Sequence, residues 1–135
     1  MADPATVPFY AMLSVAALLG LLVGSFLATL VIRLPRGQPI ALARSACPHC
    51  GHLLGALELI PVLSWVIQSR RCRVCGGIIS VFYPAMEIAS AAIAAGAVAL
   101  WSWPVWIAAM VAGWAALCVL AWALRFLSPA GNSRT

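Results

Sequence analysis

The sequence predicts an all-α integral membrane protein with three transmembrane helices and one long loop between the first and the second helix. Three observations predict this class. Of the 135 residues, 64% are hydrophobic and only 8% are charged, whereas soluble domains carry about 25% charged residues. Three apolar runs are each long enough to cross a hydrocarbon core of about 30 Å. Between the first two runs stand two cysteine pairs, which can staple a loop too small to form its own core.

The N-terminal part predicts a short tail followed by the first span. Residues 1–8 hold Asp3 but no basic residue, so we expect an external tail and no cleaved signal peptide. Residues 9–34 form the first predicted transmembrane helix, which ends in the helix-breaking run Arg33–Gly37. Gly20 and Gly24 provide a small face on which another helix can pack closely.

The loop, residues 35–77, carries the strongest chemical signal. A Cys-x-x-Cys motif at its centre is followed after 21 residues by a second one. Two such motifs can supply four thiolates to one tetrahedral zinc ion; the alternatives are two disulfides or unrelated free thiols. Four thiolates leave no open coordination position for a reacting water, so we expect the zinc to be structural. The predicted ligands are Cys47, Cys50, Cys72 and Cys75.

Other polar residues surround the predicted zinc site. His49 and His52 are expected to lie beside it rather than to replace a thiolate. Arg70, Arg71 and Arg73 partly offset the two net negative charges of a zinc ion with four thiolates. The same arginines are expected to contact anionic headgroups or an acidic partner.

Residues 78–101 form the second predicted transmembrane helix. Pro84 is expected in its first turn, where a missing N–H costs little, with Ser80 near the N-cap. Glu87 then lies about one turn inside the helix, where an ionisable side chain is costly and marks a candidate functional residue. The alternative is an interfacial carboxylate stabilised by the helix dipole and a loop arginine.

The third predicted helix covers residues 104–126, and a polar tail, residues 127–135, follows it. The turn before it, Trp101–Trp106, is rich in tryptophan, which favours the membrane–water interface. Cys118 is expected to pack as a small apolar side chain.

The charges predict the topology. The eight basic residues are all arginine, and six of them lie between Arg33 and Arg73, which indicates a cytoplasmic loop rather than a nucleic-acid surface. Three spans then place the N-terminus outside and the C-terminus in the cytoplasm. A reducing compartment also favours zinc over disulfides.

The motifs in residues 20–90 resemble the amino-terminal domain of the bacterial prepilin peptidases. These are the bifunctional leader peptidase/N-methyltransferases of type IV pili and type II secretion. The resemblance implies a bacterial inner-membrane protein with a zinc loop in the cytosol. The matching blocks, in order, are Gly24–Leu27, Arg33–Pro35, Cys47–Gly51, Ile60–Trp65, Arg71–Gly76, Ile79–Ser80 and Tyr83–Glu87.

The resemblance also reveals a departure at the peptidase site. Members of this family look like intramembrane aspartyl proteases, in which two close carboxylates share a proton and activate water. The family has an Asp-Leu-Arg pattern where this sequence reads Ala123-Leu124-Arg125, and a Pro-Asp where it reads Pro129-Ala130. The second acid belongs to a Gly-x-Gly-Asp motif on a later span, which these 135 residues do not include. We therefore expect no peptidase activity from this chain alone and no catalytic residue within it.

In the loop and at the start of the second span, the sequence also departs from the family pattern in the domain tied to methyl transfer. Glu58-Leu59 replaces the usual Asp-Asn, and Phe82 stands where an arginine usually precedes the tyrosine. The resemblance ties this domain to methyl transfer from S-adenosylmethionine, so that cofactor is implied only if methyl transfer is retained. The sequence has no glycine-rich nucleotide fingerprint.

The sequence therefore predicts a non-peptidase accessory or partner-binding subunit of a membrane complex. The alternatives are a residual prepilin N-methyltransferase or half-enzyme, and a prepilin-binding module. Expected partners are the lipid bilayer, other membrane subunits and prepilin, but no nucleic acid. The candidate partner or substrate contacts are Glu58, Arg70, Arg71, Arg73, Tyr83 and Glu87.

Overall fold

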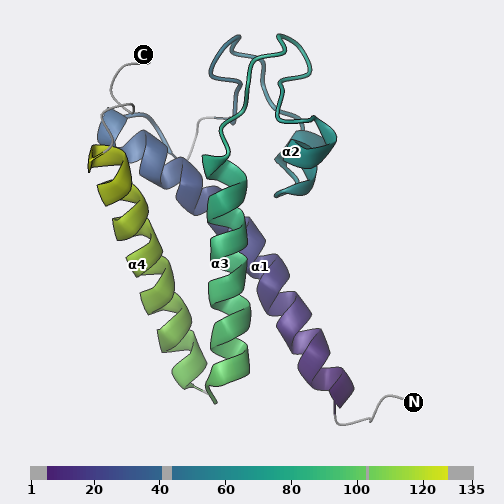
Figure 1. Cartoon of the computed structure of the whole chain (residues 1–135), viewed down its shortest axis with the longest axis vertical. Coiled ribbons are helices and arrows are strands. Elements are labelled where there is room, and N and C mark those ends of the chain that lie inside the picture. Colours follow the sequence, from purple (N-terminus) through teal and green to yellow (C-terminus); the bar gives the residue numbers. More distant parts are fainter. Residues whose placement is uncertain (1–5, 41–43, 103, 128–135) are drawn as a thin grey trace. The chain divides into compact units, whose positions relative to one another are not determined.

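The computed structural model describes residues 6–40, 44–102 and 104–127 (Figure 1). Within these ranges the chain is helical and forms no β-strand, only two isolated β-bridges. The elements are α1 (Thr6–Arg33), η1 (Leu34–Arg36), η2 (Ala56–Leu59), α2 (Leu63–Ile67), α3 (Phe82–Leu100) and α4 (Val105–Leu127), where η marks a 3₁₀-helix. The predicted fold class is confirmed. Asp3, Trp103, Ala130 and the tail 128–135, on which predictions also fall, lie outside the described residues.

Three helices are long and apolar enough to cross a membrane. The qualifying segments are Pro8–Arg36, Phe82–Leu100 and Val105–Arg125, with mean hydropathies of 2.5, 1.4 and 2.2. The shortest has 19 residues, which at 1.5 Å per residue is about 28 Å, close to the thickness of the hydrocarbon core. Arg33 and Arg125 lie in the last turns of α1 and α4, where a cation complements the helix dipole.

Helix α3 begins at Phe82, four residues after the start predicted for the second span, because the preceding residues belong to the loop. The Ile79 N–H donates to the carbonyl of Arg70 at 2.7 Å, which fixes that segment against the chain before the second cysteine motif. The Phe82 N–H donates to Ser80 Oγ at 3.2 Å, so the serine supplies a partner at the start of the helix.

The chain divides into two compact units. One comprises Met1–Gly20 and Ala89–Thr135, and its described part is packed through small residues. A Cβ on Gly20 would lie 2.6 Å from the Cα of Ala91, so only glycine permits this approach. On α4, Gly113 similarly faces Ile93, and the Trp114 indole N–H donates to the carbonyl of Ser90 at 3.2 Å.

The other unit is Leu21–Ile88, which contains the second half of α1, the cysteine loop and the first turns of α3. The loop holds three short helices, η1, η2 and α2. Helix α2 follows Val62, which has φ 59°, an uncommon conformation for a β-branched residue. The candidate functional residues of the loop lie in this unit.

Candidate functional site

The two cysteine motifs fold into two copies of the same turn. Residues Ser45–Leu54 and Arg70–Ile79 carry matching backbone hydrogen bonds, shifted by 72 − 47 = 25 positions. In each copy the N–H of the first cysteine donates to the carbonyl five residues later, and the glycine after the second cysteine donates back to the first. One isolated bridge closes each copy, Ala46 with Leu53 and Arg71 with Ile78. We call these two segments the first and the second knuckle.

A glycine with positive φ completes each knuckle. Gly51 has φ +72° and Gly76 has φ +68°, and a Cβ at either position would meet no atom within 4 Å. The demand for glycine is therefore conformational rather than steric, since residues with a side chain rarely adopt this region.

The two knuckles bring four sulfur atoms together. The ligand atoms of Cys47, Cys50, Cys72 and Cys75 all lie within 4.8 Å of one another. Between knuckles, the Sγ atoms of Cys47 and Cys75 are 3.8 Å apart, and those of Cys50 and Cys72 are 4.0 Å apart. A tetrahedron with zinc–sulfur bonds of about 2.3 Å has edges of about 3.8 Å. The cluster therefore fits a zinc ion, and Cys118 on α4 lies outside it.

The thiols differ in acidity. Backbone N–H groups of Cys75 and then Val74 donate to Cys72 and lower its pKa to about 6. At Cys50 the backbone N–H of His52 lowers the pKa, but desolvation and hydrogen bonds with the other three thiols outweigh it and raise the pKa to about 12. One thiol thus ionises readily while a neighbouring one resists further negative charge. A bound cation removes this conflict, because it stabilises all the thiolates together.

The two histidines lie beside the cluster, and neither belongs to it. The Nε2 atom of His49 is 3.2 Å from the carbonyl oxygen of Ile78, so this side chain reaches from the first knuckle to the second. A Cβ on Gly77 would come within 2.6 Å of the His49 ring, which explains the second glycine after Cys75. The Nε2 atom of His52 lies 3.6 Å from Oε2 of Glu58.

The three predicted contact arginines lie on the exposed surface of the second knuckle. The Arg70 guanidinium lies over the Trp65 ring, 5.6 Å from its centroid. Arg71 donates to the carbonyl of Gly76 at 3.5 Å, within its own knuckle. Arg73 is exposed. These side chains add positive charge around the sulfurs and do not line the cavity described next.

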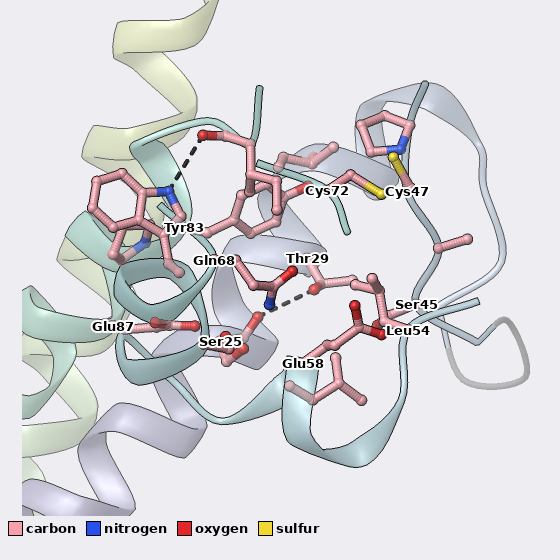
Figure 2. Close-up of a pocket in the computed structure, with 18 of the residues that line it drawn as sticks. Ser25, Thr29, Ser45, Cys47, Leu54, Glu58, Gln68, Cys72, Tyr83 and Glu87 are labelled. Atoms are coloured by element: carbon pink, nitrogen blue, oxygen red, sulfur yellow. Dashed lines mark hydrogen bonds between the residues drawn. The ribbon is translucent and has the colours of Figure 1, made fainter. Parts of the chain in front are cut away.

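The other three predicted contacts, Glu58, Tyr83 and Glu87, line one cavity (Figure 2). Its volume is about 130 Å³, and its walls come from α1, both knuckles, η2, α2 and the start of α3. Sequence reasoning missed the polar residues Ser25, Thr29 and Gln68 in this wall. A signal for two of them exists, because Ser25, Thr29 and Arg33 recur every four residues along one face of an apolar helix.

Glu87 connects α3 to the loop. Its Oε2 atom accepts the backbone N–H of Val62 at 2.6 Å, and the residue is only 6% exposed. Glu87 lies five residues after the first residue of α3, which places its Cα about 7.5 Å along the helix axis. The buried carboxylate thus holds the entry to α2 at the depth of the second turn of a membrane-spanning helix.

Glu58 lies at the end of η2 and stabilises its first turn. Its Oε2 atom accepts the Gly55 N–H at 2.9 Å. The side chain is only 9% exposed, and its other oxygen, Oε1, is buried without a hydrogen-bond partner. The Oε1 atom of Gln68 is also buried without a hydrogen-bond partner.

Together these features define an integral membrane protein with a cluster of four cysteines that fits a metal ion, in the loop after its first span, and a polar cavity beside that cluster. The model of the bacterial peptidase A24 N-terminal domain matches residues 18–102. The chain belongs to this family, as its motifs predicted.

Curated relatives agree with this assignment. The chain is 43% identical over 121 residues to a prepilin leader peptidase/N-methyltransferase of Burkholderia pseudomallei (strain 1026b), covering 71% of this chain and 39% of the relative. The protein of the same name from Myxococcus xanthus is 53% identical over 70 residues, or 52% of this chain and 21% of the relative. That from Bacillus subtilis is 43% identical over 86 residues, or 64% and 35%. The chain thus spans less than half the length of these relatives. No solved structure matches it at a significant level.

Proposed function

We propose that this chain is a zinc-stapled membrane module that binds a partner protein of a prepilin-processing or secretion complex and does not itself cleave prepilin. The observation that carries the proposal is Ala123. It occupies the position at which the family resemblance places the first catalytic aspartate, near the end of α4 and just before Arg125. A methyl group can neither share a proton with a second carboxylate nor activate a water.

The described carboxylates are already engaged in holding the loop. Glu58 accepts the N–H of Gly55, and Glu87 accepts the N–H of Val62. The Val62 N–H is part-buried, so its loss of the Glu87 acceptor would cost up to about 1–3 kcal/mol, whereas the Gly55 N–H is exposed and its bond to Glu58 contributes less. This supports a structural and binding role for both side chains over a role as a protease acid pair.

The surface of η2 and α2 supports a partner within the membrane. Its apolar side chains are largely exposed: Leu57 is 72%, Leu63 51%, Val66 57% and Ile67 62% exposed. Because the Glu87 contact holds the start of α2 beside the second turn of α3, we propose that this apolar surface lies near the level at which α3 enters the bilayer. Its occupant is therefore proposed to be another membrane-embedded subunit, such as one that acts on prepilin.

We also propose the orientation that the arginine distribution predicts. The chain lies in the bacterial inner membrane, with the N-terminus outside and the cysteine loop and C-terminus in the cytoplasm. The supporting fact is that six of the eight arginines lie from Arg33 to Arg73, at the end of the first span and in the loop. Reporter fusions after Arg44 and after Leu100 test this topology, since only the first is expected to report the cytoplasm.

A second candidate function is transfer of a methyl group from S-adenosylmethionine to the amino group of a processed pilin. The matched domain and the carboxylates of Glu58 and Glu87 in its cavity favour it. The size of the cavity opposes it. A volume of about 130 Å³ is close to that of a cavity that holds one benzene molecule, so most of a nucleoside cofactor would lie outside it.

The test is purification of the tagged chain from its native membrane in mild detergent, with mass spectrometry of the copurified proteins and a zinc assay. We expect one zinc per chain and a stoichiometric membrane partner. In parallel, the purified chain is incubated with a prepilin and, separately, with a processed pilin and labelled S-adenosylmethionine. Cleavage by the chain alone would contradict the proposal, and label transfer without a partner would establish the second candidate instead.

A further inference from the structure

Two residues that line the cavity beside the four cysteines each carry a hydrogen-bond acceptor that has no donor. Glu58 Oε1 and Gln68 Oε1 are both buried without a hydrogen-bond partner, and both residues line the cavity. Both residues belong to one compact unit and are labelled in the close-up of the pocket (Figure 2). Buried polar atoms in proteins are nearly always paired, and an unpaired one costs about 1–3 kcal/mol, more when it is charged. Two such acceptors in one cavity indicate a ligand that brings the donors.

The charged residues around this cavity, including Arg33 in its wall, have partners of their own. Arg33 donates to the carbonyls of Pro39 and Arg44, at 3.2 Å and 3.5 Å. His52 approaches the other oxygen of Glu58, Oε2, at 3.6 Å. Glu87, the second carboxylate in the wall, holds the Val62 N–H. Glu58 Oε1 and Gln68 Oε1 therefore remain two acceptors without a donor, and the carboxylate of Glu58 favours a positively charged ligand that carries donors.

The size and walls of the cavity restrict which cation fits. A volume of about 130 Å³ accommodates roughly six heavy atoms, by comparison with cavities of about 150 Å³ that bind benzene. Leu54, Trp65 and Ile79 supply apolar wall on which a carbon stem can pack. A bare divalent metal ion prefers six or more oxygen ligands, and the cavity offers two unpaired ones among the described atoms.

We propose that this cavity binds a compact organic cation, a primary ammonium or guanidinium group on a short carbon stem, which donates hydrogen bonds to Glu58 Oε1 and Gln68 Oε1. An ammonium has three donors and a guanidinium five, and neither carries an acceptor. The cation comes either from a free amine or from a lysine or arginine side chain of a bound protein. The site does not depend on the proposed partner-binding function, because the same groups face the cavity in an enzyme or a subunit.

The test compares two cations of equal heavy-atom count on the zinc-loaded full chain in detergent. n-Butylammonium has three N–H donors, whereas tetramethylammonium has the same charge and none. Isothermal titration calorimetry is expected to show saturable binding of n-butylammonium and at least tenfold weaker binding of tetramethylammonium. Equal binding of the two cations would overturn the proposal, because charge alone would then explain the affinity. Binding of magnesium in place of n-butylammonium would overturn it as well.

Variants connect the binding to the two oxygens. Glu58→Gln retains an oxygen for the Gly55 N–H but removes the charge, and we expect at least tenfold weaker binding of n-butylammonium. Gln68→Met removes the acceptor at similar size, with an expected loss of about fivefold. Gln38→Met is the matched control, because Gln38 is exposed and outside the cavity wall. Unchanged zinc content shows that each variant is folded. Wild-type affinity in Glu58→Gln would overturn the assignment.

A further arm separates the two sources of the cation. The capped tripeptide Ala-Lys-Ala is compared with its norleucine analogue, which has the same stem without the ammonium. Tighter binding of the lysine peptide than of n-butylammonium assigns the cavity to a partner's side chain. Binding of the free amine alone assigns it to a small molecule. Failure of both probes refutes the cation site, while the copurification result for the partner protein stands separately.

Discussion

The cysteine loop and the helical hairpin of α3 and α4 are held together by different kinds of contact. In the loop, η2 and α2 contain no buried residue, and the buried side chains of the two knuckles include Cys47 and Cys72, 5% and 4% exposed. Beyond the first turns of α3, the buried residues described in the hairpin are small, such as Ala94 and Ala97, 0% and 3% exposed. We therefore expect the loop to depend on its hydrogen bonds and on a metal held by the four sulfurs, whereas the spans depend on close packing of helices. Either set of contacts can be disrupted while the other persists.

The largest expected effect separates the two regions completely. Cys72→Ser removes one of the four sulfurs, and we expect loss of zinc and unfolding of the loop with all spans still inserted. Structural zinc contributes about 10–16 kcal/mol to the folding of zinc-finger peptides, more than a loop of this size can replace. Limited proteolysis of the loop, with a zinc assay on the same sample, measures the effect.

Cys118→Ser is the matched control for this experiment, because that cysteine lies on α4 outside the sulfur cluster. It is expected to retain zinc and a protease-resistant loop. If Cys72→Ser lost the metal and the loop nevertheless kept its normal resistance, the loop would be ordered by its own contacts, and the contrast between the two regions would be wrong.

The next effect concerns the carboxylate that joins the loop to α3. Glu87→Ala leaves the buried Val62 N–H without its acceptor, at a cost of about 1–3 kcal/mol to the local structure. We expect residues 60–68 to exchange amide hydrogens about tenfold faster, with zinc retained, as measured by hydrogen–deuterium exchange. Glu87→Gln keeps an acceptor oxygen and is expected to show a smaller increase. Equal rates in the two variants would mean that the hydrogen bond does not hold the loop.

Much of this architecture could be predicted from the sequence because its signals are local. The long apolar runs identify the three spans by their hydropathy. The cysteine spacing identifies the four sulfurs that the structure brings within 4.8 Å of one another. Glu58, Tyr83 and Glu87 were predicted as contacts, and the structure places all three around one cavity. The arginines predicted with them lie instead on the exposed second knuckle.

The elements that escaped prediction depend on distant contacts. Helix α2 has five residues, too few for a periodic pattern, and its start depends on Glu87, 25 positions away in sequence. The predicted span begins at residue 78 because Ile78–Val81 are apolar, yet Ile79 is hydrogen-bonded to Arg70 in the second knuckle. Gln68 joins the cavity only because the loop folds back onto α1, which no local pattern encodes.

A smaller effect tests the packing of the spans. Gly20→Ala places a methyl group 2.6 Å from the Cα of Ala91, and overpacking of this kind costs about 1–3 kcal/mol. Gly96→Ala is the matched control, because a Cβ there meets nothing within 4 Å. We expect only the first variant to lower the detergent concentration at which the helices dissociate, and neither to change zinc content. A zinc loss in Gly20→Ala would show that the two regions are not independent.

The smallest effect compares the two knuckles with each other. Gly51→Ala and Gly76→Ala each force a side chain into a left-handed conformation, at a cost of about 1–2 kcal/mol, with no steric contact to add to it. Because the knuckles share one set of hydrogen bonds, we expect both variants to weaken zinc affinity by about tenfold in competition with a chelator. Gly37→Ala imposes the same strain at φ +62°, outside both knuckles, and is expected to leave zinc affinity unchanged. A large difference in zinc affinity between Gly51→Ala and Gly76→Ala would show that the two knuckles contribute unequally to metal binding, despite their matching backbone hydrogen bonds.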